Sequence, residues 1–544
     1  MAGGSCCGGG CNINNNKDNA AKLSEDVAPH PVLDQLPGVQ FCVRTPPPWL
    51  LCFLLGFQHY ILTLGTTVMI PSLLVPQMGG GKHHKAWVIQ ASLLISGINT
   101  LLQASFGSRL PAVVVGSHAY ILPVTAIINA RRYRAIADPT ERFEQTMRGI
   151  QGALILAAAF QILVGFLGLW RNFGRALSPL SAVPLVAFTG MGLHYMGLPI
   201  LGNCVAVGLP AIIIMLFFCL YLPQFMKTRT PVFDRFAVLI VTVIGWTYAI
   251  ILTSSGVYSQ DSANFPGTCR TDRADLIRST NWIEVPLPFH WGQPTFTAGD
   301  TFAMMAASII SLIESTGAFI AIARYGSATP VPPSVISRGG GWLGIGVMLS
   351  GLFGCLTGST ISVENAGLVA LTKVGSRRVA QISAMFMIVF SVLGKFGAIF
   401  ASIPLPVAAA MYCICYSYVC AAGLGLLQFC NLNSFRSKFI LGLTFFMSLS
   451  ISQYFNDYDN HQRGPVHTHV IWFNNMVNVV FMSHASVAVL IAVFLDCTLG
   501  RKSPATRKDT GLPWWEKFYA YGADVRTDEF YALPCRLNNF FPAL

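Results

Sequence analysis

The sequence contains little charge. Asp, Glu, Lys and Arg together make up 11% of its 544 residues, against about 25% in soluble domains. Hydrophobic residues make up 53% of the chain. Several nearly uncharged runs reach or exceed the roughly 20 residues that a helix needs to cross a bilayer, namely 179–226, 236–258, 379–427 and 471–495. The composition therefore excludes a soluble protein and predicts a chain that crosses a membrane many times.

Metal-ligand spacings, phosphate-binding loops and nucleophile–base arrangements are also missing, so we expect neither an enzyme nor a cofactor. Most of the 15 cysteines stand inside apolar runs, Cys204, Cys355 and Cys415 among them. Buried cysteine usually behaves as a small hydrophobic residue. Cys6 and Cys7 could carry a lipid near the membrane, although an unstructured Gly/Asn-rich tail is the simpler interpretation.

The net charge of +12 does not indicate nucleic-acid binding, because the basic residues are spread over short loops. An excess of Lys and Arg in cytoplasmic loops is the simpler cause. With both termini cytoplasmic, the inner loops include Arg109, Arg175, Arg338, Lys373, Arg377, Arg378 and Arg436. The Arg-rich loop 130–148 falls outside in this arrangement, where three acidic residues partly balance it.

The apolar runs divide into about fourteen segments, near 49–70, 86–107, 112–129, 149–170, 181–200, 204–224, 236–256, 300–322, 341–357, 360–374, 379–401, 404–427, 437–454 and 472–495. Two are too short to span as ordinary helices. The third is interrupted by Gly116 and Pro123, and the tenth carries Glu364 and Gly367. Counted as two sevens, they occupy matching positions, which is typical of an inverted-repeat transporter with its site between broken helices.

We therefore expect an all-α polytopic membrane protein with two inverted seven-segment repeats, over 46–256 and 300–496. An extracellular loop, 257–299, would separate the repeats. Cytoplasmic tails would flank them, a disordered one over 1–45 and another over 497–544.

Two glutamates fall at membrane depth, where an ionisable side chain is costly and indicates a functional site. Glu314 lies deep in the eighth segment, where burial disfavours its charged form and makes proton uptake feasible. A neutral Glu314 bonded to a backbone carbonyl is the simpler alternative. Glu364 follows the small-residue run 358–362, which permits an extended backbone before a half-helix whose N-terminus faces a cavity. Asn365 either contacts a ligand there or caps the half-helix.

Polar side chains also mark the first and third segments. Gln58 and His59 stand midway along the first, where they either bridge helices or contact a ligand. At the break in the third, an aromatic ring such as Tyr120 could stack on a flat ligand. His118 either faces that ligand or is a hydrogen-bonded interior histidine. Together these groups suit a planar molecule with several N–H and C=O groups, such as a nucleobase, because a carboxylate accepts two adjacent N–H donors.

The pattern Glu364-Asn365-x-Gly367-x-x-x-x-Thr372-Lys373 resembles the defining motif of the nucleobase–ascorbate transporters, the nucleobase:cation symporter-2 family. Gln58-His59 resembles that family's first-helix motif, and Glu314-Ser-Thr-Gly317 resembles its eighth-helix acidic motif. The resemblance covers roughly residues 30 to 530 and is strongest to the plant branch.

The resemblance implies a core domain of segments 1–4 and 8–11 that shifts like an elevator against a gate domain, which also dimerises. It implies that Glu314 and Glu364 are the main substrate ligands, assisted at the first helix and at the two breaks by Gln58, His118, Ala119, Val363 and Asn365. It assigns affinity, the transport cycle and the shape of the site to His59, Tyr120, Gly367, Thr372 and Lys373.

The sequence departs from the family pattern at two positions. Many relatives have an aromatic residue where His118 stands, so Tyr120 could take over the stacking surface. Relatives coupled to protons or sodium often carry His or Asp four residues after the eighth-helix Glu, where this chain has Ala318. Coupling would then fall on Glu314 or Glu364.

Since Glu364 occupies the first motif position, the resemblance favours nucleobases, either xanthine and urate or adenine, guanine and uracil. We expect a plasma-membrane homodimer that imports them with a proton, sodium being the less favoured ion. Ascorbate is the second hypothesis, although animal ascorbate carriers of the family have Pro at this position. An anion exchanger or channel of the same architecture is the third, but it would offer a cationic or all-backbone site.

Overall fold

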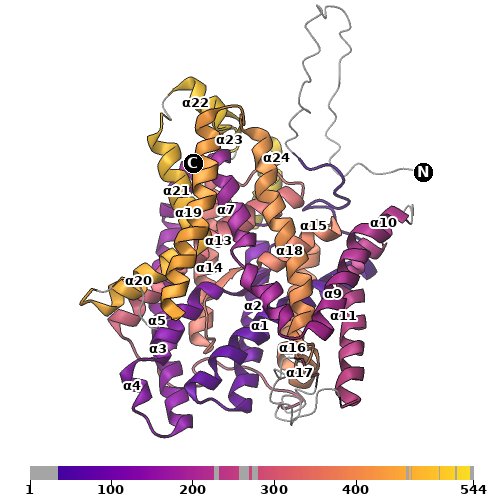
Figure 1. Cartoon of the computed structure of the whole chain (residues 1–544), viewed down its shortest axis with the longest axis vertical. Helices are drawn as coiled ribbons and strands as arrows, with labels where there is room; N and C mark the ends of the chain where they lie inside the picture. The colour runs from indigo at the N-terminus through magenta and orange to yellow at the C-terminus, as the bar shows by residue number, and fades with distance from the viewer. Residues whose placement is uncertain are drawn as a thin grey trace, which may run out of the picture.

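The computed structural model describes residues 35–225, 232–256, 269–271, 280–460, 465–466, 468–500, 503–520 and 524–539. Cys6 and Cys7, and with them the lipidation hypothesis, lie outside these ranges. Within them, each of the fourteen expected segments corresponds to a helix or to consecutive shorter elements (Figure 1).

The first half of the chain contains α1 (Trp49–Leu74), α2 (Lys82–Ser105), β1 (Val114–Gly116), η2 (His118–Tyr120), α3 (Ile121–Ile128), α4 (Arg131–Arg134), α5 (Pro139–Phe166), α6 (Leu169–Ala176), α7 (Pro179–Met191), η3 (His194–Met196), α8 (Leu198–Gly202), α9 (Val205–Leu216), the π-helical η4 (Phe217–Tyr221), α10 (Leu222–Phe225) and α11 (Val232–Ser254).

The second half contains α13 (Ala298–Tyr325), α14 (Pro333–Leu352), β2 (Ser359–Ile361), α15 (Val363–Thr372), α16 (Arg377–Val392), α17 (Gly394–Ala401), α18 (Leu405–Gly425), η5 (Leu426–Phe429), α19 (Phe435–Asn460), α20 (Ile471–Met482), α21 (His484–Thr498), α22 (Pro504–Asp509), α23 (Leu512–Glu516) and α24 (Val525–Tyr531).

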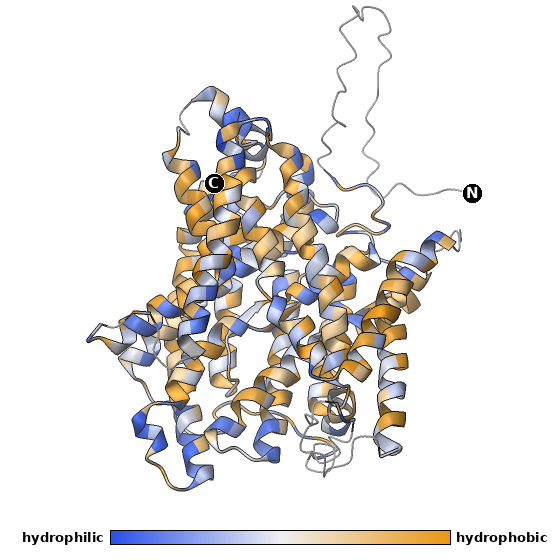
Figure 2. Ribbon diagram, in the orientation of Figure 1, coloured by the Kyte–Doolittle hydropathy of each residue, from blue (hydrophilic) through white to orange (hydrophobic). Residues whose placement is uncertain are grey.

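In the described ranges, nine helices are long and apolar enough to cross a bilayer, or eleven if each of two bent pairs counts as one span. Hydrophobic residues cover the length of these helices, and polar residues gather toward the two ends of the molecule (Figure 2). The predicted all-α polytopic membrane protein is therefore confirmed.

Two segments expected as continuous spans are sharply bent. The angle is 113° between α16 and α17 and 81° between α20 and α21. At the second bend the extended Ser483 accepts a hydrogen bond from the backbone N–H of Ser486 and so caps α21. A serine that starts a new helix inside an apolar run therefore produces a break that hydropathy alone does not reveal.

The two short segments, predicted to be broken, meet at their breaks. β1 and β2 pair antiparallel, with Val114 opposite Ile361 and Gly116 opposite Ser359, and each strand leads into a short helix. Ser117 caps η2 and Ser362 caps α15. Hydroxyl groups of neighbouring helices bind the strands as well, since Ser311 of α13 donates to the Ser359 carbonyl (2.9 Å). Extended backbone is thus satisfied by protein groups at membrane depth, where water is absent.

The helices pack in two groups, which we call the core group and the gate group after the two domains that the resemblance implies. In the core group α5 packs on α13 and α14, and α16 packs on α1 and α2. In the gate group α7 packs on α18 and α21, α18 on α9, and α19 on α21. The groups meet where α15 contacts α18 and where α13 contacts α7 and α20. The helices that carry Glu364 and Glu314 therefore both lie at the boundary.

Parts of both predicted tails are ordered. Residues 35–45 run beside the α15–α16 junction, where Phe41 forms a bridge with Val374 and the Gln40 N–H donates to the Lys373 carbonyl (3.0 Å). The end of the C-terminal region packs on the core group, where Arg338 donates to the Tyr531 carbonyl (2.9 Å). The expected disorder of 1–45 thus does not extend to its last residues, because main-chain hydrogen bonds fix them.

Cys204 is not the simple hydrophobic residue that its place in an apolar run suggests. It forms a disulfide with Cys269 of the loop predicted to be extracellular. The bond ties the start of α9 to that loop, and the 65-residue separation of the two cysteines is too long for a local sequence signal.

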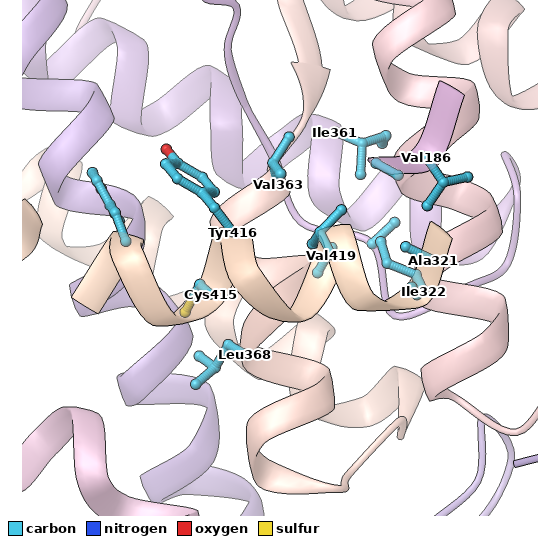
Figure 3. Close-up of a cluster of buried hydrophobic side chains, with 14 of the residues drawn as sticks. Val186, Ala321, Ile322, Ile361, Val363, Leu368, Cys415, Tyr416 and Val419 are labelled. Atoms are coloured by element: carbon cyan, nitrogen blue, oxygen red, sulfur yellow. The ribbon is translucent and has the colours of Figure 1, made fainter. Parts of the chain in front are cut away.

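The boundary between α15 and α18 leaves no room for a side chain at Gly367. A Cβ there would lie 2.1 Å from the carbonyl oxygen of Cys415. Figure 3 shows α18 in this region, with Cys415 and Leu368 on one side of the helix and Tyr416 and Val363 on the other.

We predict that Gly367→Ala lowers the stability of the purified full-length protein by about 1–3 kcal/mol, because the added methyl group meets backbone that cannot rotate aside. Thermal unfolding measures the effect. Gly425→Ala, near the end of α18 where a Cβ meets nothing within 4 Å, is the matched control and should change stability by less than about 0.5 kcal/mol. Equal stability of the two variants would contradict the close packing.

Candidate functional site

A cavity of about 610 Å³ lies between the core group and the gate group. The core group contributes residues of α1, η2, α3 and α13, and the gate group contributes residues of α7, η3, α8 and α19 to α21. The polar residues that line it are His118, Thr125, Thr189, His194, Tyr195, Glu314, Gln453, Asn456, Ser483 and His484. The remaining lining is apolar, a combination typical of small-molecule sites.

Glu314 is the sole acidic residue among the described residues that line this cavity. Its carboxylate accepts a hydrogen bond from the hydroxyl of Ser483, at 3.2 Å. One turn further along α13, Gly317 allows close approach to α7, because a Cβ at that position would lie 2.1 Å from Oγ1 of Thr189. Close packing of these helices therefore holds Glu314 at the boundary, with its carboxylate linking core to gate.

The break in the third segment brings His118 and Ala119 to the cavity. Neither ring nitrogen of His118 has a hydrogen-bond partner among the described residues. Its ring lies edge-to-face with that of Tyr195, with centroids 6.4 Å apart. This geometry favours the ligand-facing alternative over a hydrogen-bonded interior histidine. Tyr120 is fully buried and does not line the cavity, so Tyr195 supplies the neighbouring ring.

Glu364 does not line the cavity. It is 3% exposed, and three hydroxyl groups donate to its carboxylate, those of Thr66 (2.6 Å), Ser362 (2.6 Å) and Tyr416 (3.3 Å). Hydrogen bonds of this kind stabilise a buried carboxylate. Val363 is also buried. In this conformation Glu314 lines the cavity, whereas Glu364 does not line it and is enclosed by hydroxyl groups.

Asn365 and His59 extend this buried network. The Asn365 carbonyl oxygen lies 2.7 Å from Nδ1 of His59, and its amide donates to Thr63 (3.1 Å) and Ser362 (2.8 Å). Ser362 rather than Asn365 caps α15. Asn365 therefore bridges α15 to α1, a role outside the two alternatives considered from the sequence.

The other motif residues lie away from the cavity. Gln58 donates to the Arg235 carbonyl of α11 (3.2 Å), and since α11 packs on α9 of the gate group, this bond joins the two groups. Thr372 donates to the Leu368 carbonyl within α15 (2.8 Å). Lys373 ends α15 in a left-handed conformation, and its ammonium lies 3.5 Å from the carboxylate of Asp234. Gln58 and Lys373 therefore both connect to α11, through Arg235 and Asp234.

Several residues of the site were not identified from the sequence, namely Thr66, Thr189, Tyr195, Tyr416, Ser483 and His484. The polar pair Ser483-His484 inside an apolar run was a usable signal. Thr66 stands seven residues after His59, and a spacing of two helical turns places both on one face of α1. Tyr195 and Tyr416 give no local signal, because only the tertiary packing brings them to this region.

The family model described as "Permease family" matches residues 51–456. The chain is 58% identical over 527 residues to nucleobase-ascorbate transporter 7 of Arabidopsis thaliana, covering 96% of this chain and 98% of that protein. It is 52% identical over 522 residues to nucleobase-ascorbate transporter LPE1 of Zea mays, covering 96% and 99%. Among solved structures, SLC26A9 aligns with a TM-score of 0.43 at 11% identity, covering 82% of this chain and 65% of that chain.

We predict that Thr66→Val destabilises the protein by about 1–3 kcal/mol, because it removes a hydrogen bond from a buried carboxylate. The loss should be smaller when Thr66→Val is combined with Glu364→Gln, since the neutral amide depends less on that donor. Thermal unfolding of the single and double variants measures this coupling. Thr444→Val is the matched control, because Thr444 is fully buried and its hydroxyl has no partner among the described residues. An equal loss at both positions would exclude a specific contribution from the Thr66–Glu364 bond.

Proposed function

This chain belongs to the nucleobase–ascorbate transporter family of secondary transporters, and we propose that it imports a nucleobase together with a proton. The substrate is either xanthine and urate or a member of the adenine, guanine and uracil set. The protein binds it in the cavity between the core group and the gate group.

The carboxylate of Glu314 in this cavity carries the proposal. A carboxylate accepts two adjacent N–H groups in one plane, and charge-assisted pairs of this kind are stronger than neutral ones. The edge of a purine or pyrimidine presents such groups. His118 and Tyr195 stand beside this position with rings that can contact a flat molecule. The cavity volume, about 610 Å³, lies within the usual range for small-molecule sites, roughly 300–1,000 Å³.

The division of the lining between two helix groups supports an elevator-type movement. Glu314 and His118 belong to the core group, whereas Thr189, Tyr195 and Ser483 belong to the gate group. If the core group moves as a unit, it carries the carboxylate with it and breaks the Ser483–Glu314 hydrogen bond. Substrate bound to Glu314 can replace that bond, so the ligand and the gate compete for one carboxylate.

Glu314 is also the group that we assign to proton coupling. Its protonated form donates through the O–H and still accepts one N–H through the other oxygen, so the proton and the base can be bound together. Ala318, one turn later on α13, is fully buried and carries no ionisable group. Protonation of Glu314 removes the repulsion that an anionic base such as urate would meet. A neutral base meets no such repulsion, so this site accepts neutral nucleobases more readily than ascorbate.

We further propose that both termini face the cytoplasm and that the protein works as a homodimer in the plasma membrane. The Cys204–Cys269 disulfide supports the orientation, because disulfides persist in oxidising compartments. The disulfide lies at the start of the α9–α10 crossing. The next crossing helix, α11, begins near Asp234, which meets Lys373 beside the N-terminal segment. The disulfide and the N-terminal segment therefore lie at opposite ends of these crossings. The gate helices α9, α11 and α19 are the least covered, with 28%, 33% and 22% of their apolar windows buried, which leaves surface for a second copy.

We predict that uptake of labelled xanthine, adenine or uracil in a host without its own carriers rises as external pH falls and collapses with a protonophore. Glu314→Gln should reduce uptake by at least about tenfold and remove the pH dependence of what remains, because the amide can neither take up nor release the coupled proton. Surface expression is measured in parallel. Glu144→Gln, at a half-exposed position of α5 where the carboxylate pairs with Arg148, should behave as wild type.

A competition panel of unlabelled xanthine, adenine, uracil and ascorbate identifies the substrate in the same assay. Inhibition by ascorbate alone would refute a nucleobase carrier. Uptake that requires sodium and ignores pH would refute proton coupling.

We predict that His118→Phe preserves or improves nucleobase uptake, because a phenyl ring keeps the flat surface and the imidazole nitrogens have no described partner to lose. His118→Ala should raise KM, since the ring is then missing. Initial-rate kinetics of the two variants tests this. Complete loss of uptake in His118→Phe would show instead that the imidazole itself takes part in transport.

A further inference from the structure

The C-terminal region connects the gate group to the core group. The chain leaves the gate group at the end of α21, forms α22 and α23, and reaches the core group with α24. Figure 1 shows these three short helices at one end of the molecule, with α3 and α4 at the other. The transport mechanism proposed above gives this region no role.

Contacts of α22 and α23 attach the first part of the region to the gate group. The ring of Trp514 stacks on that of Phe429 in η5, with centroids 3.6 Å apart and planes at 12°. Asn431, just after η5, donates through its side chain to the carboxylate of Asp509 and through its main-chain N–H to the Asp509 carbonyl, both at 2.9 Å. Since η5 continues α18, α22 and α23 are fixed to the gate group.

Contacts of α24 attach the last part of the region to the core group. Tyr531 is fully buried, and its hydroxyl donates to the Thr329 carbonyl (2.6 Å) in the connection between α13 and α14. The hydroxyl oxygens of Thr329 and Thr527 lie 3.2 Å apart, and Arg338 of α14 donates to the Tyr531 carbonyl (2.9 Å). Buried hydrogen bonds are costly to break, so α24 is firmly attached to the core group.

Between these two attachments, α23 lies where core and gate meet, at a place that we call the seam. Arg324, Val331, Phe429, Trp514 and Trp515 all line it. The guanidinium of Arg324, at the end of α13, lies 5.7 Å from the centroid of the Phe429 ring on which Trp514 stacks. Trp515 is 5% exposed. The gap that remains measures about 20 Å³, room for little more than one water molecule. Core, gate and α23 therefore close the seam together.

The seam and the cavity lie at different ends of the same helices. In α13, Glu314 lines the cavity and Arg324 lines the seam, about 15 Å further along the helix axis. In α7, Thr189 lines the cavity. Pro179, at the start of α7, lies beside the residue before α23, because a Cβ at Gly511 would be 3.1 Å from its ring. The C-terminal region thus closes the boundary at the end away from the cavity.

We propose that α22, α23 and α24 form a latch that holds the core group against the gate group at the seam. The inference rests on the movement of the core group proposed above. A shift of α13 relative to η5 separates Arg324 from Phe429 and uncovers Trp515, so the buried rings of the latch oppose it. The latch therefore stabilises the conformation described here, and its release is a step of the transport cycle.

The test measures opening of the seam without any substrate. Ala328→Cys places a thiol at a seam position that is 3% exposed. In the purified full-length protein, the alkylation rate of this thiol follows the population of the open conformation, and peptide mass spectrometry separates it from the native cysteines. Trp514→Ala should raise the rate by about threefold to tenfold, the contribution of one stacked aromatic pair. Trp514→Phe keeps a ring on Phe429 and should restore most of the original rate.

Trp342→Ala, in the same Ala328→Cys background, is the matched control, because Trp342 stacks on Phe106 within the core group with centroids 5.6 Å apart. It should lower Tm, as Trp514→Ala does, but leave the alkylation rate unchanged. An unchanged rate in Trp514→Ala would overturn the latch. An equal rise in Trp342→Ala would overturn it as well, since opening would then reflect general loosening. If Trp514→Ala does not fold, Trp514→Leu, which keeps apolar bulk without a ring, gives the same comparison.

Uptake of labelled nucleobase by the wild type, in a host without its own carriers, separates this inference from the proposed function. Faster alkylation in Trp514→Ala without any wild-type nucleobase uptake would support the latch and refute the substrate. Wild-type uptake together with an unchanged alkylation rate in Trp514→Ala would refute the latch alone.

Discussion

A main-chain N–H or C=O group without a hydrogen-bond partner is costly at membrane depth. The rest of the structure depends on how these groups find partners where the third and tenth segments break. The antiparallel pairing of β1 with β2 supplies partners for the extended residues of both segments, and hydroxyl groups such as that of Ser311 complete the set. Once the strands are fixed, serine caps start η2 and α15 on either side of them. His118 and Glu364 therefore take their positions from a backbone requirement that precedes any ligand.

The two glutamates of the boundary are held in different ways, and this difference suggests a division of labour. Glu314 faces the cavity, and within the described part of the chain its carboxylate accepts a hydrogen bond from the Ser483 hydroxyl. Glu364 is enclosed by three hydroxyl donors, among them Tyr416 of the gate helix α18. The first is thus directly accessible to the substrate that we propose. The second links α15, α1 and α18, so a shift of the core group changes its surroundings.

Several contacts across the boundary between core and gate are single polar links that can be broken. Gln58 bonds the Arg235 carbonyl, and Lys373 faces Asp234 at 3.5 Å with its side chain half exposed. Against these, Gly367 and Gly317 permit close contact of smooth helix surfaces at the same boundary. Few polar contacts and glycine-lined helix surfaces at the boundary are compatible with the movement of the core group that we propose.

The sequence by itself determined the membrane class, the two short segments and the family, because apolar length, Gly/Pro breaks and a contiguous motif are local features. It also identified Glu314, His118 and Glu364 as unusual, since charge and imidazole are costly in lipid. Only the tertiary structure decided that Glu314 lines the cavity while hydroxyls enclose Glu364, that Tyr195 rather than Tyr120 faces His118, and that Cys204 pairs with Cys269. These outcomes depend on which helices meet across the boundary, and such long-range contacts leave no pattern in any single stretch of the chain.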